Sequence, residues 1–329
     1  MNVSILARSA FRVLVAFPLA MTACSSGASH LAPPVMAPQT LGSHRGAMNA
    51  HPLNRSWMDP GATKLDLVYL SDWGTGKVRA YSYPKGKLEG TLTNLSPAGL
   101  CVDKAGDVFV DNSRTHSILE YPHGGTSPIA VLDDSDNIPS VCSIDPITGN
   151  LAVANSGNAQ GISIFEHAKG SPTIYADPNI PFVYFCGYDN RGNLYLDGFG
   201  SQRFQFARLA HGSHAFTKIT LDQTIHWPGA VQWDGKYMAV GEQGINGNGS
   251  VIYRFAIHAN HGMKVGATPL GSSREVVQFW IDPPNVIGPD NGGDYGSAVK
   301  FWDYPRGGSP NRSLGGFDAP WGSTVSKGR

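Results

Sequence analysis

Charge is scarce in this sequence. Only 15% of its 329 residues are Asp, Glu, Lys or Arg, and the formal net charge is +0. A helical protein of this size would need many Lys and Glu residues on its surface, so the scarcity argues against a helical fold. A balanced charge also argues against nucleic acid as a partner. With 40 Gly residues, the composition instead favours a strand-rich protein with many tight turns.

Long hydrophobic runs are missing as well. The apolar run near the N-terminus, Val13–Met21, is nine residues long and follows Arg8 and Arg12. A helix that spans the roughly 30 Å hydrocarbon core of a bilayer needs about 20 residues. The sequence therefore predicts a signal peptide over residues 1–23 and not a transmembrane helix.

The end of this segment, MTAC (residues 21–24), resembles a bacterial lipobox, in which a small residue precedes a Cys that receives lipid. The resemblance implies lipidation of Cys24. Ordinary signal cleavage is the alternative, because Met21 stands where that motif usually has Leu. Ser25 resembles the outer-membrane sorting pattern. We therefore expect an exported lipoprotein of the cell envelope, held in the outer membrane and facing the periplasm or the surface. Residues 24–62 are rich in small residues and Pro, and are predicted to be a flexible tether.

No helical period appears in the remainder of the chain, but a repeat does. Six units begin 40 to 49 residues apart, at Val68, Val108, Leu151, Leu194, Tyr237 and Val286. Each contains four short apolar or alternating runs divided by Gly, Pro and Asn. In the second unit these runs are Leu100–Val102, Val108–Val110, Ile118–Tyr121 and Ile129–Leu132. The repeat predicts a six-bladed β-propeller over residues 63–329, with four antiparallel strands in each blade. A β-sandwich is the main alternative, but its strands would not recur six times in this order.

The two ends of the repeat complement each other. The first unit begins at a second strand, with no inner strand before it, and the last unit ends in PWGSTVS, which matches PAGLCVD of the first repeat position by position. We therefore expect Trp321–Val325 to supply the inner strand of the first blade. Such a closure removes an exposed sheet edge, so we expect a monomer.

An Asp follows each inner strand and begins a turn that ends in Gly-Asp, Gly-Asn, Gly-Lys or Pro-Asn. These residues are Asp103, Asp145, Asp189, Asp234 and Asp282. An Asp side chain at such a position can accept hydrogen bonds from the backbone amides that follow it. We interpret the five carboxylates as turn formers and not as metal ligands.

The pattern P-x-G-hydrophobic-x-V-D, followed by G-D/N-hydrophobic-F/Y-V-D/A-N, resembles six-bladed propellers of the NHL and gluconolactonase-like types. It is similar in architecture to virginiamycin B lyase. The resemblance covers roughly residues 65–328 and implies the fold. It implies no function, since this ring carries lactonases, lyases and pure binding modules. No catalytic motif of those enzymes can be placed on this chain residue by residue.

In such rings, the loops that enter the inner strands and those that leave the second strands surround the central funnel. Acids, amides and aromatic residues fall in these loops, so we take them as candidate ligand-binding residues. They are Asp72, Trp73, Asn112, Asn155, Asp197, Trp227, Glu242, Asn291 and Trp321. The structural alternative is that the Asp and Asn residues cap strand ends and bond neighbouring loops. The Trp residues could stack on a sugar or another flat ligand.

Two functions remain open. The first is a binding or scaffolding module for a small ligand or a protein partner at the funnel. The second is a lactonase-like or lyase-like enzyme that uses a divalent ion held by Glu242, Asp197 and Asp72. Oxygen ligands would suit Ca²⁺ or Mg²⁺. The Gly-rich loop EQGINGNGS (residues 242–250) could act as a lid in either case.

The sequence has 4 Cys residues, of which Cys24 belongs to the export signal. Cys142 and Cys186 each lie three residues before the Asp that ends their inner strands, so they are equivalent residues of adjacent blades. Cys101 is two residues before its Asp and should point the other way. The disulfide that we consider is Cys142–Cys186, and the alternative is that no pair is bridged.

Overall fold

The computed structural model describes residues 55–329 apart from 136, 157–160, 245–248 and 293–295. In these residues the secondary structure is β-strands and three short 3-10 segments, η1 (Ala62–Lys64), η2 (Ser113–Thr115) and η3 (Glu166–Ala168). The predicted signal peptide, Cys24 and most of the predicted tether lie outside them. No helix in the described part of the chain is long and apolar enough to cross a membrane.

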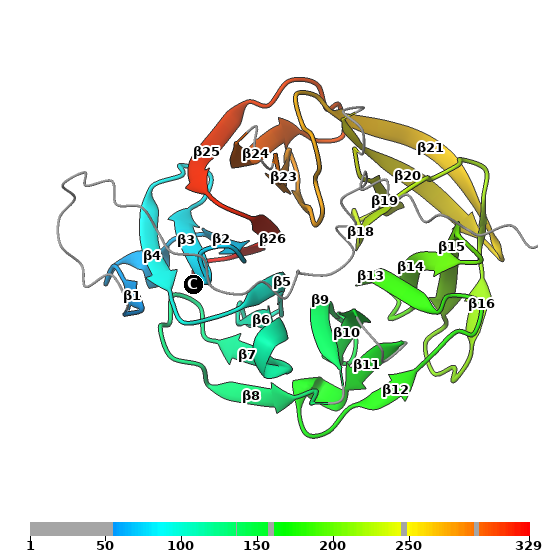
Figure 1. Cartoon of the computed structure of the whole chain (residues 1–329), viewed down its shortest axis with the longest axis horizontal. Coiled ribbons are helices and arrows are strands. Elements are labelled where there is room, and N and C mark those ends of the chain that lie inside the picture. The colour runs from blue at the N-terminus through cyan, green and yellow to red at the C-terminus, as the bar shows by residue number, and fades with distance from the viewer. Residues whose placement is uncertain (1–54, 136, 157–160, 245–248, 293–295) are drawn as a thin grey trace, which may run out of the picture. The chain divides into compact units, whose positions relative to one another are not determined.

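The strands form six sheets arranged as the blades of a propeller around one axis (Figure 1). Each blade contains four antiparallel strands that follow one another from the axis outward. This confirms the predicted fold. The period of the sequence repeat is therefore the period of the blades, numbered here 1 to 6 in chain order.

The first three blades are given from the axis outward. Blade 1 is β26 (Pro320–Ser326), β2 (Leu67–Asp72), β3 (Lys77–Ser82), β4 (Leu88–Leu92) and β1 (Trp57–Met58). Blade 2 is β5 (Pro97–Val102), β6 (Val108–Asn112), β7 (Ser117–Tyr121) and β8 (Ala130–Asp133). Blade 3 is β9 (Ile138–Ile144), β10 (Leu151–Ser156), β11 (Ile162–Phe165) and β12 (Thr173–Tyr175).

The second three blades complete the ring. Blade 4 is β13 (Phe182–Tyr188), β14 (Leu194–Gly200), β15 (Arg203–Leu209) and β16 (Phe216–Lys218). Blade 5 is β18 (Pro228–Trp233), β19 (Met238–Glu242), β20 (Ser250–His258), β21 (His261–Leu270) and a parallel edge strand β17 (Thr220–Leu221). Blade 6 is β22 (Trp280–Asp282), β23 (Asn285–Asp290), β24 (Ser297–Asp303) and β25 (Arg312–Phe317).

The C-terminal strand closes the ring, as predicted. β26 pairs with β2 in antiparallel register from Leu67–Ser326 to Asp72–Pro320. Ser323, Thr324 and Ser326 are fully buried. Because the innermost strand of blade 1 comes from the other end of the chain, the first and last blades cannot separate without breaking a sheet.

The N-terminal boundary of the propeller lies earlier than the predicted residue 63. Trp57 and Met58 pair with Thr91 and Gly90 and add a fifth strand to blade 1. Ala62 is fully buried within the cluster formed between blades 1 and 2. Two residues are too few for a detectable strand period. The predicted tether, residues 24–62, therefore includes this edge strand of blade 1.

The predicted Asp turns are confirmed in four blades. In each of these blades the Asp Oδ1 atom accepts a hydrogen bond from a backbone N–H two to four residues later, at distances between 2.6 Å and 2.9 Å. The residues are Asp103, Asp145, Asp189 and Asp234. Asp282 differs because two prolines, Pro283 and Pro284, follow it and have no N–H to donate. Its carboxylate instead accepts from Lys327 Nζ at 2.9 Å.

The predicted disulfide Cys142–Cys186 is wrong, since the bond joins Cys101 to Cys142 with the Cα atoms 5.6 Å apart. Side chains alternate along a strand, so the equivalent residues Cys142 and Cys186 both point toward the preceding blade and cannot meet. Cys186 accordingly faces the carbonyl oxygens of Val141 and Ala152, in blade 3, at 4.0 Å. Cys101 is out of phase by one residue, so it points toward the following blade, where Cys142 lies.

Candidate functional site

The second strand of most blades ends in an acid or amide that bonds the loop entering the inner strand. Asp72 Oδ1 accepts from Ala319 N at 3.0 Å, and Asn112 Oδ1 accepts from Ser96 N at 2.6 Å. The sheet register shifts between the inner and second strands at this end of blades 1 to 5. The shift leaves backbone N–H groups of the loop without ladder partners, and the side chain satisfies them.

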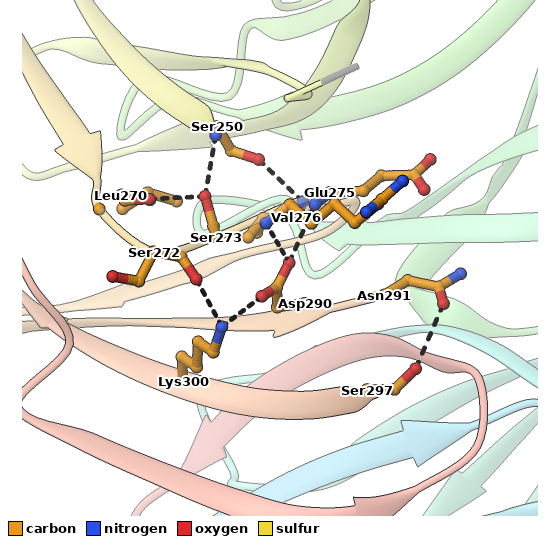
Figure 2. Close-up of polar contacts among 12 residues, drawn as sticks. Ser250, Leu270, Ser272, Ser273, Glu275, Val276, Asp290, Asn291, Ser297 and Lys300 are labelled. Atoms are coloured by element: carbon orange, nitrogen blue, oxygen red, sulfur yellow. Dashed lines mark hydrogen bonds and ion pairs between the residues drawn. The ribbon is translucent and has the colours of Figure 1, made fainter. Parts of the chain in front are cut away.

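Blade 6 shows this arrangement in full (Figure 2). Asp290 Oδ1 accepts from the backbone N–H groups of Arg274 and Glu275 at 2.7 Å and 2.9 Å, while its Oδ2 receives Lys300 Nζ at 2.6 Å. The predicted residue Asn291 lies beyond the strand and accepts from Ser297 Oγ at 3.4 Å. The carboxylate of Asp290 is thus committed to closing the blade.

The three carboxylates proposed as metal ligands are engaged in the same way. Asp72 is fully buried and paired with Arg79 at 2.9 Å. Glu242 accepts from the backbone N–H groups of His226 and Trp227 at 2.7 Å and 2.8 Å. Asp197 Oδ1 accepts from Phe185 N at 3.1 Å.

The structure does not bring these three carboxylates together. Among the described residues, the one group of three His, Cys, Asp or Glu side chains with ligand atoms within 4.8 Å of one another is Asp103, Asp107 and Glu120, on another part of the molecule. The metal site predicted at the funnel therefore has no geometric basis. The central residues of the predicted lid, 245–248, lie outside the described residues.

Asp197 is fully buried, like Asp72, but has no cationic partner among the described residues. Removal from water raises the pKa of this carboxyl well above its ordinary value, and the bond from Phe185 N–H opposes the rise. Burial also raises the pKa of Tyr184 to about 12, with a further contribution from the charge of Asp197. The carboxyl of Asp197 is fully buried, whereas Tyr184 is partly exposed.

The predicted aromatic residues have different fates. Trp73 and Trp321 are partly buried, and Trp321 packs against the large core cluster of blades 3 to 6. Trp227 forms an edge-to-face contact with Phe199, with ring centroids 5.1 Å apart, and Phe199 contacts Tyr184 at 5.5 Å. Phe182, at the start of β13, is 61% exposed. An aromatic group thus stands at the junction of blades 4 and 5.

A cleft of about 520 Å³ begins at this aromatic group. One wall comes from the β14–β15 hairpin and β15, with Phe199, Arg203 and Phe204; the other comes from the segment Lys218–His226 that leads into blade 5. Phe204 and Phe206 stack on the same side of β15, with ring centroids 6.4 Å apart. The volume is in the range of small-molecule sites, which are typically about 300–1,000 Å³.

The turn at the rim of the cleft has unusual backbone geometry. Ser201 and Gln202 connect β14 to β15 and have φ values of 49° and 61°. Both positions of this two-residue hairpin turn favour Gly, Asn or Asp, and a residue of another type there costs on the order of 1 kcal/mol. Ser201 and Gln202 thus place side chains at the rim of the cleft, at two positions whose backbone conformation favours Gly.

Sequence reasoning missed this cleft because its residues belong to outer strands and to a connection between blades. The available signal was RFQF (residues 203–206), in which two Phe residues alternate with polar side chains on an outer strand. Of the predicted residues, Trp227 and Glu242 are together beside the cleft, and the others remain in their own blades, most of them in strands.

A second cavity of about 250 Å³ lies on the axis of the ring. The inner strands line it with Cys186, Tyr188 and Trp233 among other residues. Burial of Cys186 raises the pKa of its thiol far above the ordinary value. This thiol is therefore protonated at neutral pH and is a poor nucleophile.

No protein-family model and no curated protein sequence matches the chain. Solved structures do match. One is a chain from a crystal structure of a nidogen/laminin complex, with a TM-score of 0.66 and 12% identity over 80% of this chain and 99% of that one. Another is a protein of unknown function from Bacteroides caccae, with a TM-score of 0.60 and 12% identity over the same shares. At this identity, the likeness establishes the six-bladed propeller fold alone.

Proposed function

We propose that this protein is an exported, lipid-anchored propeller that binds an acidic sugar in the cleft between blades 4 and 5. The observation that carries the proposal is the composition of the cleft. Phe199 and Phe204 offer aromatic surface, Arg203 and Lys218 offer positive charge, and no carboxylate occurs among the described residues that line it.

Each of these features suits a sugar with a carboxylate. The apolar face of a sugar ring packs on aromatic rings, and an Arg guanidinium binds a carboxylate through two parallel hydrogen bonds. Gln202 and Gln205, also in the lining, each offer both donors and acceptors for hydroxyl groups.

Export, anchoring and subtype complete the proposal. We propose that residues 1–23 are removed on export, that Cys24 carries the lipid, and that the tether holds a monomeric propeller of the NHL or gluconolactonase-like type off the outer membrane. Incorporation of a labelled fatty acid that is lost in Cys24→Ala tests the anchor. The metal-dependent lactonase or lyase alternative is not proposed, because its three carboxylates are bonded to backbone N–H groups or to Arg79 and lie apart.

Binding of oligogalacturonate, followed by intrinsic Trp fluorescence or by calorimetry, tests the site. We expect Arg203→Ala to weaken binding about tenfold or more, since a hydrogen bond to a charged group contributes about 1.5–3 kcal/mol, and Phe204→Ala to weaken it as well. Arg191→Ala is the matched control, because Arg191 lies in the Asp189 turn at the opposite end of the blade. Binding that is equally strong in both cleft variants, or equally strong for a neutral cello-oligosaccharide, would contradict the proposal.

A further inference from the structure

A buried polar cluster lies at one end of the interface between blades 2 and 3. The apolar part of this interface contains Phe109, Leu132, Val153 and Phe165. At its end stand Asp111 on β6, Asn155 on β10, Ser163 on β11, and Asp134 in the loop after β8. All four side chains are at most 3% exposed.

Alternation along the strands directs these side chains toward one another. Asp111 follows Phe109 by two residues on β6, so it faces blade 3, and Asn155 follows Val153 by two residues on β10, so it faces blade 2. An added Cβ at Gly99 would lie 2.6 Å from the Ser140 carbonyl oxygen, in blade 3, and 2.8 Å from Asp111 Oδ2. The carboxylate of Asp111 therefore reaches across to the neighbouring blade.

Asp111 is fully buried, yet neither of its carboxylate oxygens has a hydrogen-bond partner among the residues that the structure describes. The equivalent residue of blade 1 shows what is missing. Ser71 Oγ donates to the Ala98 carbonyl of the next blade at 2.6 Å and accepts from Gly322 N at 2.7 Å. A carboxylate at the position of Ser71 has no proton to donate to a carbonyl of the next blade, and neither oxygen of Asp111 receives a hydrogen bond from the described residues.

Asp134 and Asn155 each contribute another acceptor without a donor. Ser163 Oγ donates to Asp134 Oδ1 at 2.8 Å. Because a hydroxyl has one proton, Ser163 Oγ must accept from Asn155 Nδ2, which lies 2.8 Å away. This fixes the orientation of the Asn155 amide and leaves Asn155 Oδ1 and Asp134 Oδ2 unpartnered.

Four buried oxygens on three side chains thus have no hydrogen-bond donor or positive partner among the described residues. One proton on Asp111 could satisfy at most one acceptor, whereas a metal ion is bound by several oxygens at once. Burial raises the pKa of Asp111 well above its ordinary value, and repulsion from the nearby charge of Asp134 adds to it. A cation would remove both penalties.

We propose that Asp111, Asp134 and Asn155 bind a calcium ion between blades 2 and 3. Carboxylate and amide oxygens are the ligands that Ca²⁺ prefers, and its variable geometry suits a site built from three separate segments. Mg²⁺ requires near-ideal octahedral geometry and keeps several waters, so a fully buried site favours the larger ion. This site lies away from the sugar-binding cleft and does not depend on it.

Thermal unfolding of the purified full-length protein tests the proposal. Ca²⁺ at a hundredfold excess over Kd should raise the melting temperature by on the order of 5 °C relative to EGTA, and calorimetry should find one ion per chain. Asp111→Asn should melt above the wild type in EGTA, because it removes an unpartnered buried charge, and below the wild type in Ca²⁺. The crossing of the two curves is the expected signature.

Two further variants make the result decisive. Asp134→Asn retains an oxygen for Asn137 and Ser163 yet loses the charge, so it should also abolish the Ca²⁺ response. Glu120→Gln alters the separate acidic group near Asp103 and should leave the response intact. A wild type indifferent to Ca²⁺, a response that survives both Asn variants, one that disappears in Glu120→Gln, or an equal response to Mg²⁺ would overturn the assignment.

Discussion

Removal of the Cys101–Cys142 disulfide should destabilise the propeller strongly. The bond joins the inner strands of adjacent blades across 41 residues of sequence. In the chain-entropy description, a loop of that length restricts the unfolded chain by about 4 kcal/mol at 25 °C. We therefore expect Cys101→Ala/Cys142→Ala to lower the free energy of unfolding by about 4 kcal/mol. With a urea m value of about 3 kcal/mol/M, the midpoint of unfolding should fall by roughly 1 M.

Equilibrium urea unfolding, with and without reductant, measures this effect. Reductant should lower the midpoint of the wild type to that of the double variant and leave the double variant unchanged. Cys186→Ala is the control, because Cys186 is buried and free and its variant should remain sensitive to reductant. Reduction of the denatured wild type should also release two additional thiols per chain. A wild type that unfolds at the same urea concentration with and without reductant, and releases no further thiols, would refute the pairing.

Two more predictions concern closure and burial. Deletion of residues 320–329 removes the inner strand of blade 1, so the chain should lose its cooperative melting by circular dichroism and its compact elution by gel filtration; a deletion that melts like the wild type would contradict ring closure. Burial raises the pKa of Asp197 in the folded protein, so between the unfolded pKa of about 3.9 and the folded pKa the folded state holds a proton that the unfolded chain has released. Stability should therefore fall as pH rises through that interval, and Asp197→Asn should make this slope shallower in urea unfolding from about pH 4 to about pH 8. The remaining slope comes in part from Asp111, whose pKa burial also raises. Parallel pH profiles of the wild type and the variant would contradict the prediction.

The propeller could be predicted from the sequence because its blades repeat the same pattern of strands and turns. Strand alternation, a Gly-containing turn after an Asp, and a period above forty residues all indicate one supersecondary unit. The closing strand could be predicted for the same reason, since PWGSTVS has the pattern of an inner strand without the rest of a blade. The edge strand Trp57–Met58 could not, because its pairing depends on the outer strand β4 and not on any local pattern.

The site was less predictable, because residues of different blades that lie on the same face of the ring are not necessarily close to one another. Asp72, Asn112 and Glu242 do occur at corresponding ends of their second strands, as the alignment predicted. Each accepts hydrogen bonds within its own blade or its entering loop, so the shared residue type follows from a shared backbone requirement. The predicted disulfide Cys142–Cys186 is wrong for a related reason. The two residues are equivalent in adjacent blades, so their side chains point in the same direction around the ring and do not meet.

The residues that depart from the blade pattern are consequently the informative ones. An acceptor at the end of the second strand is explained wherever a backbone N–H meets it, as at Asn112. Asp111, one residue earlier, faces the next blade and lies against Gly99, with no donor to its carboxylate among the described residues. At the equivalent position of blade 4, Asp197 accepts from Phe185 N of its own inner strand. At that of blade 1, Ser71 both donates and accepts. A buried carboxylate without such a contact among the described residues, beside two further unpartnered oxygens, is what the proposed calcium ion would explain.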